Sequence, residues 1–296
     1  MLRNLIVVLL FPAFLHAQRV DMDVFVGMSN YQGDLQQMVF TFSNAQFAGG
    51  LIGKIAIGNK VYVRTGFSFG KLIGDDKTNN EKNKPRNLNF ESKLNEFSLG
   101  LEYHFVNMEA GKISPYVFVS GGIFKYNPYT FYNDGSGMKK YYLEPLSTEG
   151  QGISSINGAA PYKLTQFCVP FGMGIKYQLN CNLNLGIEFR QTKLFTDYLD
   201  DVSQKYVDQA ALRAAKGQIA ADIAWRGDEY NGNPYPSAGK PRGNPAQNDW
   251  YYFACFTVGL RLNDCQSGMF SLGGIFNRGG GGDSKRIRNQ VGCPKF

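Results

Sequence analysis

Residues 166–203, QFCVPFGMGIKYQLNCNLNLGIEFRQTKLFTDYLDDVS, decide the fold. On both sides of the turn LNCN, apolar side chains alternate with small or polar ones, which indicates two antiparallel β-strands whose faces meet different surroundings. A soluble β-sandwich would bury the apolar face and leave charge in water. A membrane barrel would turn the apolar face to lipid and keep charge inside. The hairpin alone allows both architectures.

The first 17 residues, MLRNLIVVLLFPAFLHA, have the features of a secretory signal peptide. Arg3 precedes an apolar run from Leu5 to Leu15, and the small residue Ala17 stands at a plausible cleavage position. The alternative is a transmembrane anchor, but the run is too short to span a bilayer. The sequence after residue 17 has no apolar stretch long enough for a membrane helix. If the exported chain lies in a membrane, we expect it to span it as strands.

Composition also favours an exported β protein. Aromatic residues make up 14% of the chain and Gly numbers 35, whereas charged residues reach only 19%. No Pro- or Ser-rich linker separates two parts of residues 18–263, so we expect one domain there. The net charge of +7 is dispersed, and an exported protein would not meet nucleic acid, so we expect no nucleic-acid partner.

Similar alternation occurs elsewhere and predicts eight strands in total. They are residues 22–31, 47–57, 61–70, 93–105, 115–126, 166–178, 183–195 and 250–262. The run 115–126 is too uniformly apolar for its faces to be assigned.

The lengths of the connections between strands distinguish a membrane barrel from a soluble sandwich. The connections after the first, third, fifth and seventh strands are long, and the others are short. Outer-membrane barrels have an even strand count, short periplasmic turns and long extracellular loops. We therefore predict an all-β fold, an eight-stranded antiparallel outer-membrane β-barrel over residues 18–265 that is embedded in the lipid of the cell outer membrane.

The predicted inner face carries charges of both signs. They are Lys54, Arg64, Glu96, Glu102, Lys176, Glu188, Arg190 and Arg261. Small barrels fill their interior with side chains, so we expect an internal ion-pair network and no open pore. His104 falls on the same face, and we expect it to join this network rather than to serve as a catalytic base. The sequence predicts no catalytic residue, metal site or cofactor.

Two motifs resemble a known family. SNYQGDL at Ser29–Leu35 and the more specific TDYLDDVSQKYVD at Thr196–Asp208 are similar to the PorG-type outer-membrane barrels of Bacteroidetes, which belong to the type IX secretion and gliding machinery. The resemblance covers essentially the mature chain. It implies an eight-stranded barrel that associates with a periplasmic ring-forming lipoprotein and its partner protein, and it does not imply catalysis.

The motif residues allow two interpretations. They are Thr196, Asp197, Tyr198, Leu199, Asp200 and Asp201. Three carboxylates could bind Ca²⁺, but their spacing is not that of a known calcium loop. We favour the alternative, in which the aspartates order the strand-to-loop junction through backbone hydrogen bonds. The following segment has the composition of a surface helix interrupted at Gly217.

Five cysteines in an oxidising compartment suggest a disulfide and an unpaired thiol. Cys181 lies in the turn between the sixth and seventh strands, and Cys265 follows the eighth, so both fall at the periplasmic rim. We predict a Cys181–Cys265 disulfide, or one of the two paired with Cys293; the alternative is that all are reduced and buried. We expect Cys168 and Cys255 to be packing residues.

The tail, residues 266–296, is basic. It carries Arg278, Lys285, Arg286, Arg288 and Lys295 against Asp283 alone. An even strand count places both chain ends in the periplasm, so we expect the tail to contact a periplasmic partner; the alternative is a loose tail near anionic surfaces. The expected function is a structural component of the type IX secretion system. Its rivals are a passive surface barrel, acting as a narrow channel or adhesin, and, more weakly, a membrane hydrolase.

Overall fold

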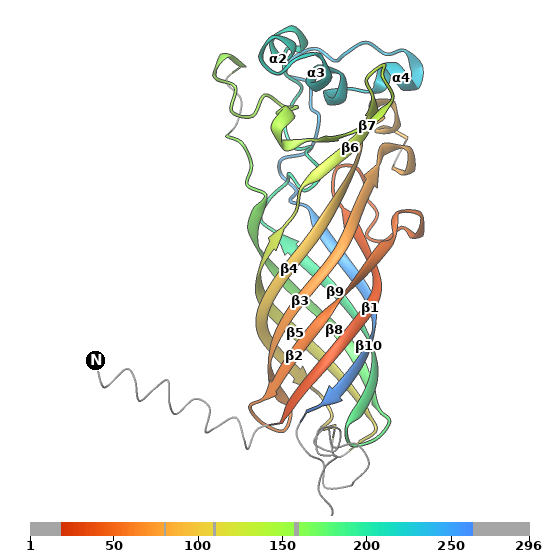
Figure 1. Ribbon diagram of the computed structural model, residues 1–296, viewed down its shortest axis with the longest axis vertical. Coiled ribbons are helices and arrows are strands. Elements are labelled where there is room, and N and C mark those ends of the chain that lie inside the picture. The colour runs from red at the N-terminus through yellow and green to blue at the C-terminus, as the bar shows by residue number, and fades with distance from the viewer. Residues whose placement is uncertain (1–18, 80, 109–110, 157–159, 263–296) are drawn as a thin grey trace, which may run out of the picture. The chain divides into compact units, whose positions relative to one another are not determined.

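Eight antiparallel strands close into a barrel in the computed structural model, which describes residues 19–79, 81–108, 111–156 and 160–262 (Figure 1). The strands are β1 (Val20–Gln32), β2 (Gln46–Ala56), β3 (Val61–Asp75), β4 (Asn89–His104), β5 (Ile113–Lys125), β8 (Thr165–Gln178), β9 (Leu183–Leu194) and β10 (Trp250–Arg261). Each pairs with the next in this series, and β10 returns to pair with β1. Ring closure gives both β1 and β10 a second hydrogen-bonded neighbour. The predicted fold class is confirmed.

Long and short connections alternate between the two ends of the barrel. The long ones, residues 33–45, 76–88, 126–164 and 195–249, lie at one end, and the short ones, 57–60, 105–112 and 179–182, lie at the other (Figure 1). The first and last described strands also meet at the short-turn end, where the Leu262 backbone N–H donates to the Val20 carbonyl over 2.8 Å. The long-loop end and the short-turn end are therefore chemically distinct surfaces.

Strands β3 and β4 extend further toward the long loops than the sequence analysis predicted. Their pairing continues to Asp75 and Asn89, so the second long connection is shorter than expected. The sequence did not reveal this extension because its outward-facing side chains are polar. Lys71 and Glu91, which form an ion pair of 2.8 Å, stand where apolar residues would be needed to recognise a strand.

The third and fourth long connections contain secondary structure. Strands β6 (Pro128–Asn133) and β7 (Met138–Tyr142) form a hairpin in the third long connection, where the sequence analysis predicted no strand, and β6 also pairs with the long-loop end of β4. Helices α2 (Gln209–Lys216), α3 (Gln218–Ala224) and α4 (Gly227–Asn231) follow in the last loop. The predicted interruption at Gly217 lies between α2 and α3, where the glycine has a φ of 90°. Short 3₁₀ turns cover Phe42–Asn44, Asp76–Thr78, Lys84–Arg86, Glu144–Leu146 and Ser154–Ile156.

Apolar side chains cover the outer face of the barrel. On β4, Phe97 and Leu99 are 57% and 56% exposed, whereas Glu96 and Glu102, which point inward, are buried. The same alternation exposes Val24 and Val26 of β1, and equivalent residues of the other strands. Water would penalise an apolar surface of this extent, so the outer face is suited to lipid. Among the described residues, none of the helices combines the length and the apolar character required to traverse a bilayer.

The interior toward the long loops is an apolar and aromatic core. Its members come both from the barrel wall, such as Phe25 and Phe253, and from the loops, such as Leu199 and Ile223. Packing there leaves no room for a side chain at Gly50, since a Cβ at this position would approach Phe25 Cε1 to 2.6 Å. The barrel and its long loops therefore share one core.

Candidate functional site

A network of charged side chains fills the barrel from the short-turn end to its middle. Four cations, Lys54, Arg64, Lys176 and Arg190, face four carboxylates, Asp23, Glu96, Glu102 and Glu188, and every one of them is at most 4% exposed. Buried charges require close partners, because burial removes the stabilisation that water gives to an ion. The network meets that requirement, because its four cations face four carboxylates.

Each part of the network is held at contact distance. Asp23 Oδ2 accepts both lysines, at 2.6 Å from Lys54 Nζ and 2.5 Å from Lys176 Nζ. The Arg64 guanidinium bridges two strands, with Nη1 2.7 Å from Glu102 Oε2 and Nη2 2.8 Å from Glu188 Oε1. Charge-assisted hydrogen bonds of this geometry are stronger than neutral ones and fix side-chain positions.

Neutral groups complete the network. The Tyr116 hydroxyl donates to Glu188 Oε2 over 2.7 Å, and the Tyr251 hydroxyl donates to Glu96 Oε2 over 2.5 Å. Arg190 Nη2 lies 3.0 Å from Glu188 Oε1. The long side chains therefore occupy the lumen at this level.

His104 belongs to this network. Its Nε2 lies 2.8 Å from Glu102 Oε1 and its Nδ1 lies 2.7 Å from Ser114 Oγ, while the ring stacks on Tyr116. The Ser114 hydroxyl also donates to the Val106 carbonyl over 2.6 Å. His104 is 1% exposed, so a substrate has no approach to it in this arrangement.

Seven of the eight interior charges named from the sequence lie in the network. Arg261 lies instead near the short-turn rim, where its side chain is 13% exposed and its Nε is 3.7 Å from Asp21 Oδ1. Sequence reasoning missed Asp23, which joins both lysines. The alternation of Asp21, Asp23 and Phe25 along β1 was the signal that could have found it, because all three point inward.

The TDYLDDVS motif lies at the junction between the barrel and the last long loop. Asp200 Oδ1 accepts the Val202 N–H over 2.9 Å, and its Oδ2 accepts the Tyr31 hydroxyl. Asp201 accepts the hydroxyls of Thr148 and Tyr162 over 2.5 and 2.8 Å. These contacts agree with the loop-ordering interpretation.

The other motif residues are tied to the same junction. Thr196 Oγ1 accepts the Tyr198 N–H over 3.2 Å, and the Leu199 N–H donates to Asp249 Oδ2 over 2.9 Å. Burial raises the pKa of Asp197 to about 8 and that of Asp201 to about 6. Within the described ranges, no group of three or more His, Cys, Asp or Glu side chains is arranged to hold a metal ion.

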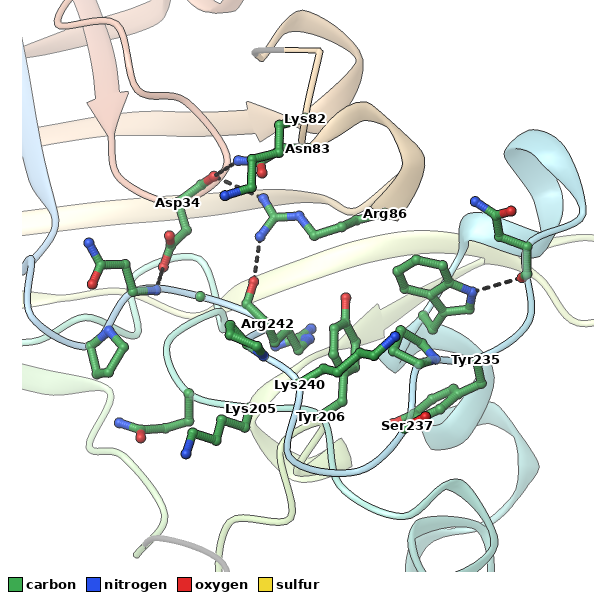
Figure 2. Close-up of a pocket in the computed structure, with 18 of the residues that line it drawn as sticks. Asp34, Lys82, Asn83, Arg86, Lys205, Tyr206, Tyr235, Ser237, Lys240 and Arg242 are labelled. Atoms are coloured by element: carbon green, nitrogen blue, oxygen red, sulfur yellow. Dashed lines mark hydrogen bonds between the residues drawn. The ribbon is translucent and has the colours of Figure 1, made fainter.

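Two arginines tie the four long loops together. Arg86 donates to the Asp34 carbonyl over 2.9 Å and to the Arg242 carbonyl (Figure 2). It also donates to Asp76 Oδ1 over 2.7 Å. Arg242 in turn lies 3.0 Å from Glu149 Oε1 and donates to the Asp201 carbonyl. This pair, which we call the arginine latch, fixes the relative positions of the loops.

A pocket of about 910 Å³ opens beside the arginine latch (Figure 2). Three long connections, residues 33–45, 76–88 and 195–249, supply its lining. Lys82, Lys205, Lys240, Tyr206, Tyr235 and Trp225 are among the side chains that border it. Sequence reasoning did not identify this pocket, because its residues are far apart in the chain.

Several candidate residues fall outside the described residues. They are Arg278, Lys285, Arg286, Arg288 and Lys295 of the tail, together with Cys265, Cys293 and the signal segment 1–17. Cys181 lies in the short turn 179–182, at the same end as Leu262. The disulfide remains a prediction. Cys168 and Cys255 are buried in the barrel.

The closed ring of eight strands, the apolar outer face and the charged interior together define a β-barrel of the outer-membrane type. The chain belongs to the family described as "Domain of unknown function (DUF6089)", whose model matches residues 1–222. No curated protein matches the chain.

Solved outer-membrane barrels are similar in fold at low sequence identity. Ail of Yersinia pestis, in complex with the heparin analogue sucrose octasulfate, is 8% identical with a TM-score of 0.39, and the match covers 82% of this chain and 98% of that one. Neisserial surface protein A is 8% identical with a TM-score of 0.40, covering 82% and 96%. A major outer membrane protein of Thermus thermophilus is 13% identical with a TM-score of 0.39, covering 83% and 100%.

Proposed function

We propose that this chain is a structural barrel of the cell outer membrane that anchors the type IX secretion machinery, by docking its periplasmic ring-forming lipoprotein and that lipoprotein's partner protein. The observation that carries the proposal is the filled interior, in which paired charges and an apolar core occupy the space that a conduit would need. A barrel packed in this way is suited to holding a position in lipid. The resemblance of its two motifs to PorG-type barrels supplies the identity of the machinery.

The short-turn end is the docking surface in this proposal. Lys60 and Lys112 are exposed in two of its turns, and the chain leaves β10 there at Leu262. The basic tail, residues 266–296, follows Leu262 in the sequence and carries five cations. A partner with an acidic surface would therefore be attracted to this end.

The proposal assigns no catalytic role and no cofactor. Among the rival functions, a narrow channel has little support, since Arg64 and Arg190 occupy the lumen together with their carboxylate partners. Planar-bilayer conductance tests this rival directly. Stable single-channel steps whose conductance changes in an Arg64→Ala variant would favour the channel over the anchor.

Neutralising the tail tests the docking role. A chain in which Arg278, Lys285, Arg286, Arg288 and Lys295 are changed to Gln keeps its length, and the matched control changes five uncharged tail residues to Gln. We expect the first variant to assemble in the outer membrane, to lose the lipoprotein on mild-detergent affinity purification and to reduce secretion, while the control retains both.

Barrel assembly is checked by the heat-dependent mobility of the protein on a gel. If the Gln variant retains both the lipoprotein and normal secretion, the tail is not the docking element. If removal of residues 266–296, combined with Lys60→Gln and Lys112→Gln, also leaves both unchanged, the anchoring function itself is wrong.

A further inference from the structure

We propose that the pocket beside the arginine latch binds an anionic saccharide that approaches from outside the cell. This inference goes beyond the anchoring function, because it concerns the opposite end of the barrel and a different class of ligand. It rests on the charge, the unsatisfied donors and the aromatic lining of one preformed cavity.

The pocket is built before any ligand arrives. Its volume of about 910 Å³ lies within the range of small-molecule sites, roughly 300–1,000 Å³. Its walls are fixed by the arginine latch and by the Asn244 N–H, which donates to Asp34 Oδ2 over 3.0 Å. The indole N–H of Trp225 donates to the Asn233 carbonyl over 3.1 Å and so sets the ring position (Figure 2). A rigid site loses little entropy on binding.

Positive charge at the pocket is only partly compensated. Arg86 and Arg242 each contact a carboxylate, whereas the exposed ammonium groups of Lys82, Lys205 and Lys240 have no ion-pair partner among the described residues. Asp34 is the one acidic side chain among the described lining residues, and it accepts the Asn244 N–H. Three uncompensated cations around one concave surface favour an anion.

Two phenol groups at the pocket lack partners. The hydroxyls of Tyr206 and Tyr235 are buried, and neither has a hydrogen-bond partner within the described part of the chain. The side chain of Tyr206 is 3% exposed. Burial raises the pKa of Tyr206 to about 12 and also raises that of Tyr235, so both groups keep their protons near neutral pH. Buried donors without acceptors are unfavourable, so the wall of this pocket is incompletely satisfied without a ligand.

The aromatic lining favours a sugar ring over other anions. The Tyr206 ring packs edge-on against Trp225 at 5.6 Å and against Tyr235 at 5.7 Å. Rings that stand beside hydroxyl and amide donors match a pyranose, which has apolar C–H faces and a polar edge. Arginine clusters also recognise acidic peptides, but Arg86 and Arg242 are already paired with Asp76 and Glu149, so the aromatic lining favours the sugar. The described lining residues lie in connections rather than in strands.

Calorimetry on the full-length protein in detergent tests the proposal. The anionic saccharide probes are trigalacturonate and mannose 6-phosphate, compared with trigalactose, mannose, inorganic phosphate and hexaglutamate. We expect at least one anionic saccharide to bind about tenfold or more tightly than its neutral counterpart, and to bind more weakly as salt is raised. In a Trp250→Phe background, where Trp225 is the remaining tryptophan, its fluorescence should change on binding.

Matched variants locate the site. Lys205→Gln with Lys240→Gln should weaken anionic-saccharide binding at least about fivefold. The control, Lys77→Gln with Lys163→Gln, removes the same charge from exposed lysines outside the pocket and should leave affinity unchanged.

Four outcomes would overturn the proposal. The first is that neither anionic saccharide binds. The second is that neutral sugars or inorganic phosphate bind as tightly as the anionic saccharides. The third is tighter binding of hexaglutamate, which would mean that the pocket takes acidic peptides. The fourth is equal weakening by the two lysine double variants, which would show a diffuse effect of net charge.

Discussion

The barrel interior and the pocket at the long-loop end both gather cations, but they differ in how those cations are paired. Inside, Lys54 and Lys176 share one carboxylate oxygen of Asp23 at 2.6 and 2.5 Å. At the pocket, Lys82, Lys205 and Lys240 have no carboxylate within ion-pair distance among the described residues. Paired and buried cations are part of the architecture, whereas exposed and unpaired cations are available to a ligand. Substitution in the interior network should therefore lower the free energy of unfolding strongly, whereas substitution of a pocket lysine should change it little.

The largest effect is expected from Asp23→Asn. It leaves two buried ammonium groups facing a neutral amide, and removing one partner from a buried ion pair costs about 3–5 kcal/mol. Urea-dependent refolding in detergent should show a correspondingly lower free energy of unfolding. Glu81→Gln, which breaks the exposed Lys84–Glu81 pair, is the control and should give no measurable shift. Similar shifts in both variants would mean that the interior network adds no special stability.

A smaller, local effect is expected from Arg242→Met. It leaves the buried carboxylates of Glu149 and Asp201 without their cation, and we expect a loss of about 2–4 kcal/mol confined to the long loops. Hydrogen exchange should become faster in residues 195–249 and stay unchanged in β8 and β9. Arg226→Met, which removes the more exposed Arg226–Glu229 pair, should leave exchange near the wild-type rate. Faster exchange throughout the barrel would contradict the separation of the two regions.

The loop junction should be more stable in acid than in base. The folded-state pKa values of Asp197, about 8, and Asp201, about 6, lie above their ordinary value of about 4, so the folded state holds these protons more tightly. Their contribution to stability is therefore lost as pH rises from about 4 to about 8. Protection of residues 195–249, corrected for intrinsic exchange, should be greater at pH 5 than at pH 8. Asp197→Asn should flatten the upper part of this dependence; an unchanged profile would contradict it.

The smallest effect on stability is expected from substitution of a pocket lysine. Lys205→Gln should change the free energy of unfolding by less than about 0.5 kcal/mol, because an exposed lysine without a partner contributes little to folding. Chemical denaturation of Lys205→Gln and of Asp23→Asn, measured side by side, compares the smallest and the largest expected change in the free energy of unfolding. A large destabilisation by Lys205→Gln would show that this lysine serves the fold and is not free for a ligand.

The barrel could be predicted from the sequence because residue types alternate regularly along its strands. Apolar residues alternate with small or polar ones without interruption from Gln166 to Gln178, and the structure starts and ends this strand within one residue of the prediction. The inward charges followed from the same alternation. The β6–β7 hairpin was missed because its strands are short and lack a clear alternation of apolar and polar residues, although DGSG marked a turn between them.

The pocket could not be predicted, for a different physical reason. It depends on hydrogen bonds between distant residues, such as those of Arg86 with the carbonyls of Asp34 and Arg242. Local patterns carry no information on which loops meet. Lys205 and Lys240 look like ordinary surface lysines until the fold places them around one cavity.

The pairing of β1 with β10 has a consequence for biogenesis. Because Asp21 is paired with Arg261 and Gln32 with Trp250, the ring can close only after the last strand has arrived. A polypeptide that stopped before Trp250 would expose the open sides of β1 and β9 to its neighbours, which invites aggregation. Closure of the ring must therefore wait until the chain has been made beyond Trp250, and an incomplete molecule would carry an unmatched seam.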